Sequence, residues 1–282
     1  MPVVAVIFDF DDTLMPDSTT ALLKSFGIDT DEFWRERAQG LVLKGYDPPM
    51  AYLRLILDLV GEGKPLGQLS NADLMTFGNS LDDKYFIGIP EIFDDLHAIV
   101  REVRDVTVEF YIVSSGLQGL IMGSKIVEKY FSGVYACQLD EDTNGVLRHV
   151  KRCVTFTEKT RFLFEINKGI EQADSAVQPG LVNREVAGGD RRVPFANMIY
   201  AGDGLTDIPC FSLVSKNGGT SFGIFEPGSQ ISAKKAFQEF LQTGRVVGSH
   251  APRYRADDEL GSLLRAAVST KAGSIAVNRG TV

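Results

Sequence analysis

Aspartates gather in two short stretches of the chain. Asp9 and Asp11 belong to DFDDT, while Asp203 and Asp207 belong to GDGLTD. In an extended segment, residues two positions apart point to the same side, so Asp9 and Asp11 direct two carboxylates into one pocket. Neighbouring carboxylates repel each other unless a cation lies between them, and Mg²⁺ binds through one or two carboxylates together with substrate phosphate. The pattern therefore favours a magnesium site.

Each aspartate pattern taken alone also has a simpler explanation. A lone D-x-D is more often a solvated acidic turn than a ligand pair. Asp207 can neutralise the N-terminus of a following helix, and Asp203 can cap it. Gly202 and Gly204 permit a tight turn around Asp203 in either case.

Two weaker polar patterns occur between the aspartate stretches. Ser114-Ser115-Gly116 follows an apolar run and precedes a helical pattern, so we expect a hydroxyl and backbone N–H groups at a helix N-terminus, where anions bind. Lys159 can bring positive charge to a phosphoryl group. Because serine commonly caps helices and an isolated lysine is commonly solvated, both assignments depend on the aspartates.

The elements that must position these residues alternate between strands and helices. Residues 3–8 (VVAVIF) form a β-branched apolar run typical of a strand buried on both faces, and residues 106–113 and 196–201 form similar runs. Each run ends at one of the polar stretches. Strands that alternate with helices predict a doubly wound, mostly parallel α/β sheet, in which ligands bind beyond the carboxyl ends of the strands.

The rest of the chain divides by pattern. Residues 19–85 are helical in character, with glycine and proline breaks, and residues 140–154 have the turn residues of a hairpin with Asn144-Gly145 at its tip. We expect a long loop or insertion over residues 169–192 and a loose end from Lys271.

In their order and spacing, the polar stretches resemble the motifs of the haloacid dehalogenase superfamily of hydrolases, most closely its phosphoserine-phosphatase-like branch. The resemblance covers residues 3–225 and is strongest at DFDDT and GDGLTD. It implies an α/β core formed by residues 1–14 and 89–282. A small helical cap, residues 15–88, would be inserted after the first strand, near Thr13.

The same resemblance implies a catalytic pair and a metal site. Asp9 would be the nucleophile that forms an aspartyl-phosphate intermediate. Asp11 would protonate the leaving group and then act as the base for the attacking water. Mg²⁺ would be held by Asp9, Asp203 and the backbone carbonyl of Asp11.

The remaining roles follow from the same family pattern. Ser114, with Ser115 and Gly116 beside it, would bind the phosphoryl oxygens, and Lys159 would neutralise their charge. Asp207 would bind the metal through water or orient Lys159, with Gly204 and Thr13 in support.

The resemblance also bears on the substrate. Haloacid dehalogenases lack the acid at Asp11 because a halide leaves without a proton, so a small phosphate monoester is the expected substrate. Phosphoserine phosphatases carry a glutamate shortly after the first motif to hold the substrate's amino group, but Ser18 stands there, with Asp17 beside it. This departure argues against phosphoserine specificity. Four cationic residues of the cap are candidates to meet a substrate or to form solvated helix faces: Arg35, Arg37, Lys44 and Arg54.

Composition narrows the setting and the partners. A net charge of −8 and a pI near 5.0 disfavour nucleic acid, although a small phosphorylated metabolite is allowed. Three widely spaced cysteines indicate neither a disulfide framework nor a zinc site. The N-terminal stretch suggests no signal peptide or anchor, so we expect a cytoplasmic protein without membrane contact. Monomer and homodimer both remain open.

Two other classes of function use similar residues. A signalling receiver also holds an aspartyl phosphate between strand-end aspartates, a hydroxyl and a lysine, although a helical insertion after Thr13 counts against it. A binding protein of the same fold that has lost its activity ranks low, because every residue type needed for catalysis is present.

Overall fold

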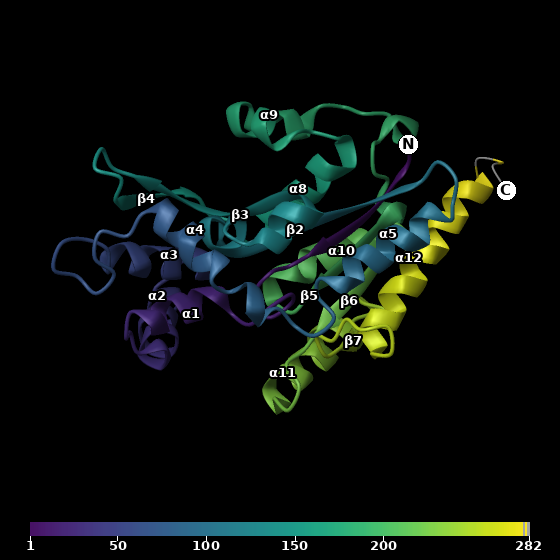
Figure 1. Cartoon of the computed structure of the whole chain (residues 1–282). Helices are drawn as coiled ribbons and strands as arrows, with labels where there is room; N and C mark the ends of the chain where they lie inside the picture. The colour runs from purple at the N-terminus through teal and green to yellow at the C-terminus, as the bar shows by residue number, and fades with distance from the viewer. Residues whose placement is uncertain (279, 281–282) are drawn as a thin grey trace.

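The computed structural model describes residues 1–278 and 280, and in this part of the chain seven strands form one sheet. The strands are β1 (Val3–Phe8), β2 (Thr107–Leu117), β3 (Phe131–Glu141), β4 (Leu147–Arg152), β5 (Met198–Gly202), β6 (Thr220–Ile224) and β7 (Gly248–His250). Their order is β4-β3-β2-β1-β5-β6-β7, and each neighbouring pair is parallel except β3 and β4 (Figure 1). The predicted doubly wound, mostly parallel fold is confirmed.

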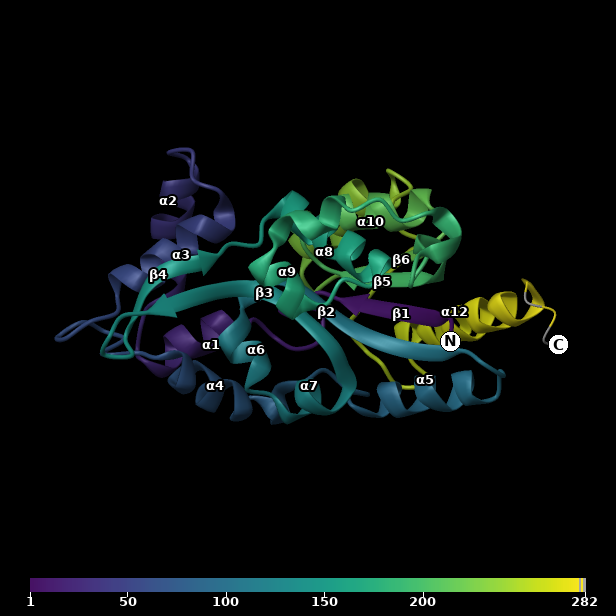
Figure 2. The same cartoon turned by 90° about the horizontal axis from the view of Figure 1, so that it is seen from above.

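Both faces of the central strand β1 are buried, as its apolar run predicts. One face packs toward α8 (Phe156–Lys168) and α10 (Ile208–Lys216), and the other toward α5 (Glu91–Arg101) and α12 (Glu259–Asn278). Figure 2 shows the sheet between these two helical layers. The carboxyl end of β1 therefore opens at the edge between the layers, where ligands bind in such folds.

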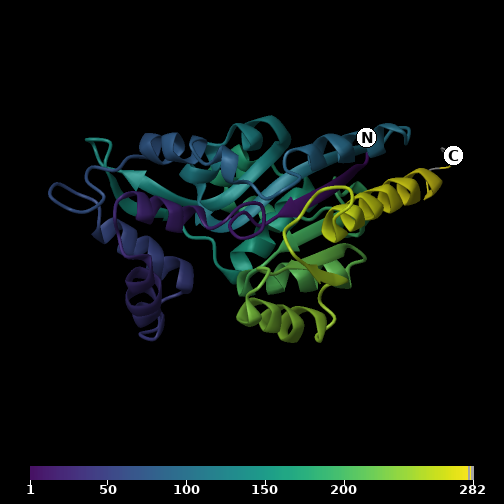
Figure 3. The same cartoon turned by 60° about the horizontal axis from the view of Figure 1, so that its bottom comes forward.

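Helices and turns occupy residues 16–88, between β1 and α5. They comprise α1 (Ser18–Ser25), a π-helical segment (Glu32–Ala38), α2 (Gln39–Val42), α3 (Pro48–Asp58), α4 (Asn71–Asn79) and a 3₁₀ turn (Asp82–Lys84). Figure 3 shows this segment at one end of the molecule, away from α12. The chain leaves the core and returns to it at adjacent points, because Phe86 N donates to the Leu14 carbonyl oxygen at 2.9 Å. The expected helical cap after the first strand is present.

The β3–β4 hairpin extends from the core sheet to the cap. Its expected tip, Asn144-Gly145, is observed, with Gly145 at φ 77°. Asn71 N of α4 donates to the Glu141 carboxylate at 2.6 Å, and Leu147 N donates to the Leu69 carbonyl at 2.9 Å. The cap thus rests on an extension of the core sheet. The sequence pattern of the cap did not predict this contact.

Shorter elements complete the fold. They are α6 (Gln118–Met122), α7 (Lys125–Tyr130), α9 (Gln172–Val177), α11 (Gln230–Lys235), a π-helical segment (Ala236–Leu241) and 3₁₀ turns at Pro179–Asn183, Gly188–Asp190, Phe195–Asn197 and Leu205–Asp207. The expected loop over residues 169–192 therefore contains a short helix and two turns. None of the helices that the structure describes has the length and apolar character needed to cross a bilayer.

The prediction of a loose end from Lys271 was wrong for residues 271–278. They continue α12, whose Ala272 and Ile275 are buried in the same apolar cluster as α5. Small residues such as alanine and glycine give this segment only a weak helical pattern of apolar and polar residues. The helix is stabilised there by tertiary packing, which a local pattern does not reveal. Residues 279, 281 and 282 lie outside the described part of the chain.

Candidate active site

Polar residues from four separate stretches meet at the carboxyl ends of β1, β2 and β5. Asp9 follows β1, and its backbone N–H donates to the Ala201 carbonyl of β5 at 2.9 Å, which places the two aspartate stretches side by side. A cavity of about 260 Å³ opens here, lined by Asp9, Asp11, Asp12, Asp17, Thr19, Trp34, Pro48, Pro49, Tyr52, Ser114, Ser115, Gly116, Asp203, Gly204 and Thr206. The sequence-predicted residues from the first, second and last stretches therefore share one cavity.

Lys159 does not line this cavity, but it binds two carboxylates, one of which belongs to the lining residue Asp9. Its Nζ atom donates to Asp9 Oδ2 at 2.9 Å and to Asp207 Oδ1 at 2.7 Å, and its side chain is 0% exposed. The Tyr200 hydroxyl also donates to Asp207 Oδ1, at 2.7 Å. Asp207 therefore holds Lys159 against Asp9. Of the two roles expected for Asp207, metal binding through water and orientation of Lys159, this contact fits the second.

Burial dominates the electrostatics of these groups. It raises the pKa of Asp9 to about 7, although Lys159 opposes the shift. It likewise raises the pKa of Asp203 to about 7, against the opposing charge of Lys235. Burial alone would lower the pKa of Lys159, but Asp207 and Asp9 outweigh it and raise that pKa above its usual value. Lys159 is therefore a permanent cation, while Asp9 and Asp203 need further positive charge to ionise fully at neutral pH.

A divalent cation fits this donor set. Carboxylate oxygens of Asp9, Asp203 and Asp207 lie within 4.8 Å of one another. Three carboxylates with a single buried ammonium leave an excess of negative charge, and hard oxygen ligands suit Mg²⁺. Asp9 and Asp203 line the cavity, whereas Asp207 is fully buried, does not line it and accepts three hydrogen bonds, so we regard Asp9 and Asp203 as the available side-chain ligands.

The Asp11 carboxylate lies in the same cavity but outside that acidic group. Its Oδ1 accepts the Ser18 N–H at 2.7 Å. A Cβ atom at Gly116 would lie 2.3 Å from Asp11 Oδ2, so only glycine leaves room for this carboxylate. Burial raises the pKa of Asp11 well above its usual value, which keeps a proton available on it. Asp12 follows at φ 56° and turns the chain away from β1.

The serines at the end of β2 differ from the expected arrangement. The strand continues to Leu117 and α6 begins only at Gln118, so Ser114 and Ser115 are on extended chain and not at a helix N-terminus. The pairing of β2 with β3 is irregular between Val113 and Leu117, and this irregularity allows the chain to remain extended past the two serines. Ser114 Oγ accepts the Gly116 N–H at 3.0 Å. Ser115 Oγ is shielded from solvent and has no hydrogen-bond partner among the described residues.

The supporting residues act through backbone geometry. Gly204 N donates to Asp207 Oδ2 at 2.9 Å. A Cβ atom at Gly202 would lie 2.5 Å from Asp207 Cγ, which explains the glycine before Asp203. Thr13 is fully buried, and its carbonyl oxygen accepts the Tyr254 hydroxyl at 2.6 Å. These contacts fix both aspartate stretches to the core.

Several residues that line the cavity, and Tyr200 behind Asp207, were not predicted as site residues. Asp12 and Asp17 are visible in the sequence beside the first motif, whereas Trp34 and Tyr52 come from the cap and have no local signal. Tyr200 lies within the apolar run of β5, where a tyrosine is an ordinary strand residue. Only the folded arrangement shows that its hydroxyl reaches Asp207.

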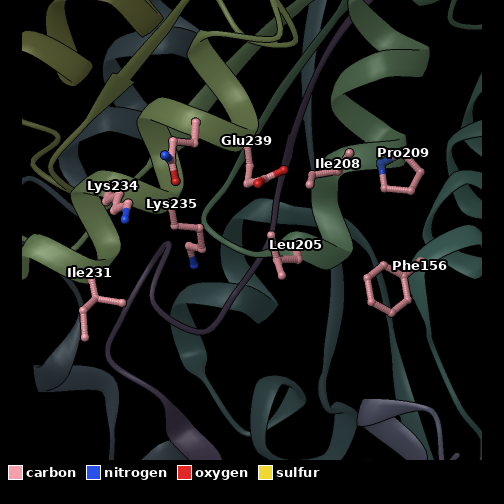
Figure 4. Close-up of a pocket in the computed structure, with 9 residues that line it drawn as sticks. Phe156, Leu205, Ile208, Pro209, Ile231, Lys234, Lys235 and Glu239 are labelled. Carbon is pink, nitrogen blue, oxygen red and sulfur yellow. The ribbon is translucent and has the colours of Figure 1, made fainter.

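A second, larger cavity of about 750 Å³ adjoins the loop that carries Asp203. Figure 4 shows Leu205 and Ile208 on one side of it, with Ile231, Lys234 and Lys235 on the other. Lys235 reaches toward the first cavity, with its Nζ 3.5 Å from Asp203 Oδ2. The larger cavity has none of the strand-end aspartates, so we assign the chemistry to the smaller one.

Comparison with known proteins identifies one similar curated sequence, and no family model matches the chain. An uncharacterised protein of Borreliella burgdorferi is 33% identical over 264 residues, covering 84% of this chain and 88% of that protein. This level of identity over most of both chains shows common descent.

Solved structures that share the fold include two with a TM-score above 0.5. A haloacid dehalogenase family hydrolase from Salmonella enterica serovar Typhi has a TM-score of 0.52 at 17% identity, covering 83% of this chain and 66% of that one. A protein from Vibrio cholerae described as a "probable phosphoserine phosphatase" has a TM-score of 0.54 at 14% identity, covering 97% and 67%. This chain thus spans about two thirds of their length.

Proposed function

Because the chain belongs to the family of the uncharacterised Borreliella burgdorferi protein and has the haloacid dehalogenase fold of the phosphoserine-phosphatase-like branch, we propose that it is a magnesium-dependent phosphatase of small phosphate monoesters. The observation that carries this proposal is the meeting of Asp9 and Asp203 at one cavity, with Lys159 bound to the Asp9 carboxylate. Lys159 Nζ is 2.9 Å from Asp9 Oδ2, and the oxygens of Asp9 and Asp203 lie within 4.8 Å.

In the proposed reaction, Asp9 attacks phosphorus and the bond to the ester oxygen breaks. Asp11 gives its proton to that oxygen, so the alcohol leaves neutral. Asp11 then accepts a proton from a water molecule, which attacks the aspartyl phosphate and releases inorganic phosphate. Both carboxyl groups return to their starting states.

The neighbouring groups support this sequence. The Lys159 ammonium offsets the charge that a phosphate dianion brings to the Asp9 carboxylate. Ser114 and Ser115 would donate hydrogen bonds to the phosphoryl oxygens, which would give the unpartnered Ser115 hydroxyl a partner. Bound Mg²⁺, held by Asp9, Asp203 and the Asp11 carbonyl, would supply further positive charge at the phosphoryl group.

The setting is part of the proposal. Cys137, Cys153 and Cys210 are free thiols, which fits a reducing, cytoplasmic location. The acidic cavity of about 260 Å³ suits a small phosphorylated metabolite as the partner and not a nucleic acid backbone. Both monomer and homodimer are compatible with the proposed chemistry.

A phosphatase screen with an Asp9→Asn control tests the function. With Mg²⁺ present, the protein should release phosphate from members of a panel of small phosphomonoesters, and Asp9→Asn should reduce turnover by at least about a thousandfold, because an amide is a poor nucleophile. Retention of most activity by the variant would defeat the mechanism. A long-lived phosphorylated protein without turnover would favour the signalling receiver, and no phosphorylation or hydrolysis at all would favour the silent binding protein.

A further inference from the structure

The cap contributes an aromatic wall to the active-site cavity. Trp34 and Tyr52 both line it, with ring centroids 5.6 Å apart. Their polar atoms are already used, since Trp34 Nε1 donates to Thr20 Oγ1 at 2.7 Å and the Tyr52 hydroxyl donates to the Ser115 carbonyl at 2.6 Å. What these side chains offer a ligand is therefore ring surface, which binds apolar groups and organic cations.

The charged residues that line the same cavity are all aspartates. Asp9, Asp11, Asp12, Asp17 and Asp203 line it, and within the described part of the chain its lining includes no lysine, arginine or histidine. Four cap cations considered from the sequence do not line this cavity: Arg35, Arg37, Lys44 and Arg54.

Nearby cations leave part of this negative charge uncompensated. Lys159 is held between Asp9 and Asp207, and Lys235 lies beside Asp203. Bound Mg²⁺ would add positive charge only at Asp9 and Asp203. Asp12 and Asp17 also line the cavity, and neither forms an ion pair among the described residues, although the Lys24 ammonium acts to lower the pKa of Asp17 against the larger effect of burial.

We propose that the cavity selects phosphomonoesters of amino alcohols, whose positively charged alcohol part lies between the aromatic wall and the carboxylates of Asp12 and Asp17, and that it rejects esters with a second anionic group. This proposal rests on the phosphatase function above and specifies its substrate class. An ammonium group gains both from the carboxylates and from contact with the rings of Trp34 and Tyr52. A carboxylate at the same place meets only like charge.

Two matched substrate pairs test the selectivity of the unmodified protein. Phosphoethanolamine and O-phosphoserine differ by one carboxylate, and kcat/KM should be at least about tenfold higher for phosphoethanolamine. Phosphocholine and its neutral isostere, in which a tert-butyl group replaces the trimethylammonium group, differ by one positive charge. The cation should again be preferred by about tenfold, and added salt should reduce the preference by screening.

Conservative variants test which residues cause the preference. Asp12→Asn keeps a residue that tolerates φ 56°, and Asp17→Asn keeps an N-cap for α1, where Asp17 Oδ1 accepts the Thr20 N–H at 2.7 Å. The double variant should bring both substrate ratios to within about threefold of unity. As a matched control, Asp31→Asn with Asp58→Asn removes two exposed cap carboxylates outside the cavity and should leave both ratios unchanged.

The outcomes separate the substrate class from the function. If O-phosphoserine is hydrolysed as efficiently as phosphoethanolamine while Asp9→Asn remains inactive, the selectivity proposal is wrong and the phosphatase stands. The selectivity proposal is equally wrong if the double variant and its control change the ratios to the same extent. Absence of hydrolysis for every ester would overturn both.

Discussion

Replacing Lys159 by methionine would test whether the buried charges are balanced as the structure indicates. Methionine approximates the alkyl chain of lysine but leaves the Asp9 and Asp207 carboxylates without their shared cation, at 2.9 Å and 2.7 Å in the native protein. Removing one partner of a buried ion pair costs about 3–5 kcal/mol. We therefore expect Lys159→Met to lower the free energy of unfolding at pH 8 by about that amount.

The loss should depend on pH in a defined direction. Burial already raises the pKa of Asp9 from 3.8 to about 7 with Lys159 in place, and loss of the ammonium removes an effect that lowers it. A folded-state pKa above the unfolded value means that the folded protein holds more protons, so stability falls as pH rises from about 4 through about 7. The free energy of unfolding of the Lys159→Met variant should fall more steeply with rising pH than that of the native protein. The difference between the two proteins should therefore be smaller at pH 5 than at pH 8.

Urea unfolding at pH 5 and pH 8 with a metal chelator would measure both effects, because the chelator prevents a cation from replacing the ammonium. Lys235→Met is the matched control. The Lys235 side chain is 30% exposed and its Nζ is 3.5 Å from Asp203 Oδ2, so removal of the ammonium should cost less than about 1 kcal/mol. A deficit for Lys159→Met below about 1 kcal/mol at pH 8, or equal deficits at both pH values, would refute the reasoning.

Three further measurements address the catalytic arrangement. Asp11→Asn should lower kcat/KM, which reports formation of the aspartyl phosphate, by at least roughly a hundredfold for alkyl phosphates but far less for nitrophenyl phosphate, since nitrophenolate leaves without a proton; equal losses of kcat/KM would contradict the general-acid role. Gly116→Ala should sharply reduce turnover because its Cβ would lie 2.3 Å from Asp11 Oδ2, whereas Gly180→Ala, with nothing within 4 Å, should be neutral in the same assay. The apparent Mg²⁺ dissociation constant should fall by about tenfold or more from pH 6 to pH 8, because a cation displaces protons from Asp9 and Asp203, whose pKa values are about 7; a flat titration would exclude both as ligands.

The sequence predicted those parts of the molecule that have a short-range pattern. A strand buried on both faces, such as β1, has a continuous apolar run, and the polar residue after it must lie at the sheet edge. The alternation of such runs with helical segments was sufficient to predict the parallel sheet and the meeting of Asp9 with Asp203. In contrast, α12 and β7 were missed because their stability comes from packing against distant elements and not from local pattern.

The same distinction applies to the cavity. The aspartates were predictable because their spacing along an extended segment fixes which side they face. Tyr52 and Trp34 reach the cavity only through the fold of the cap, and the Tyr200 hydroxyl meets Asp207 only because β5 pairs with β1. The position of Ser114 was predicted, but its expected helix N-terminus was not found, since the irregular pairing with β3 keeps the chain extended.

The continuity of the cap with the β3–β4 hairpin has a consequence for motion. One buried apolar cluster joins the cap to the sheet, and it includes Phe33 and Leu53 of the cap, Leu147 of β4 and Leu117 of β2. A large swing of the cap would expose this apolar surface to water at a free-energy cost of about 25 cal/mol per Å². Ligands should therefore exchange through small displacements of side chains at the cavity mouth. Backbone amides of α3 should exchange with deuterium nearly as slowly as those of β2, in contrast to the fast exchange of a freely hinged lid.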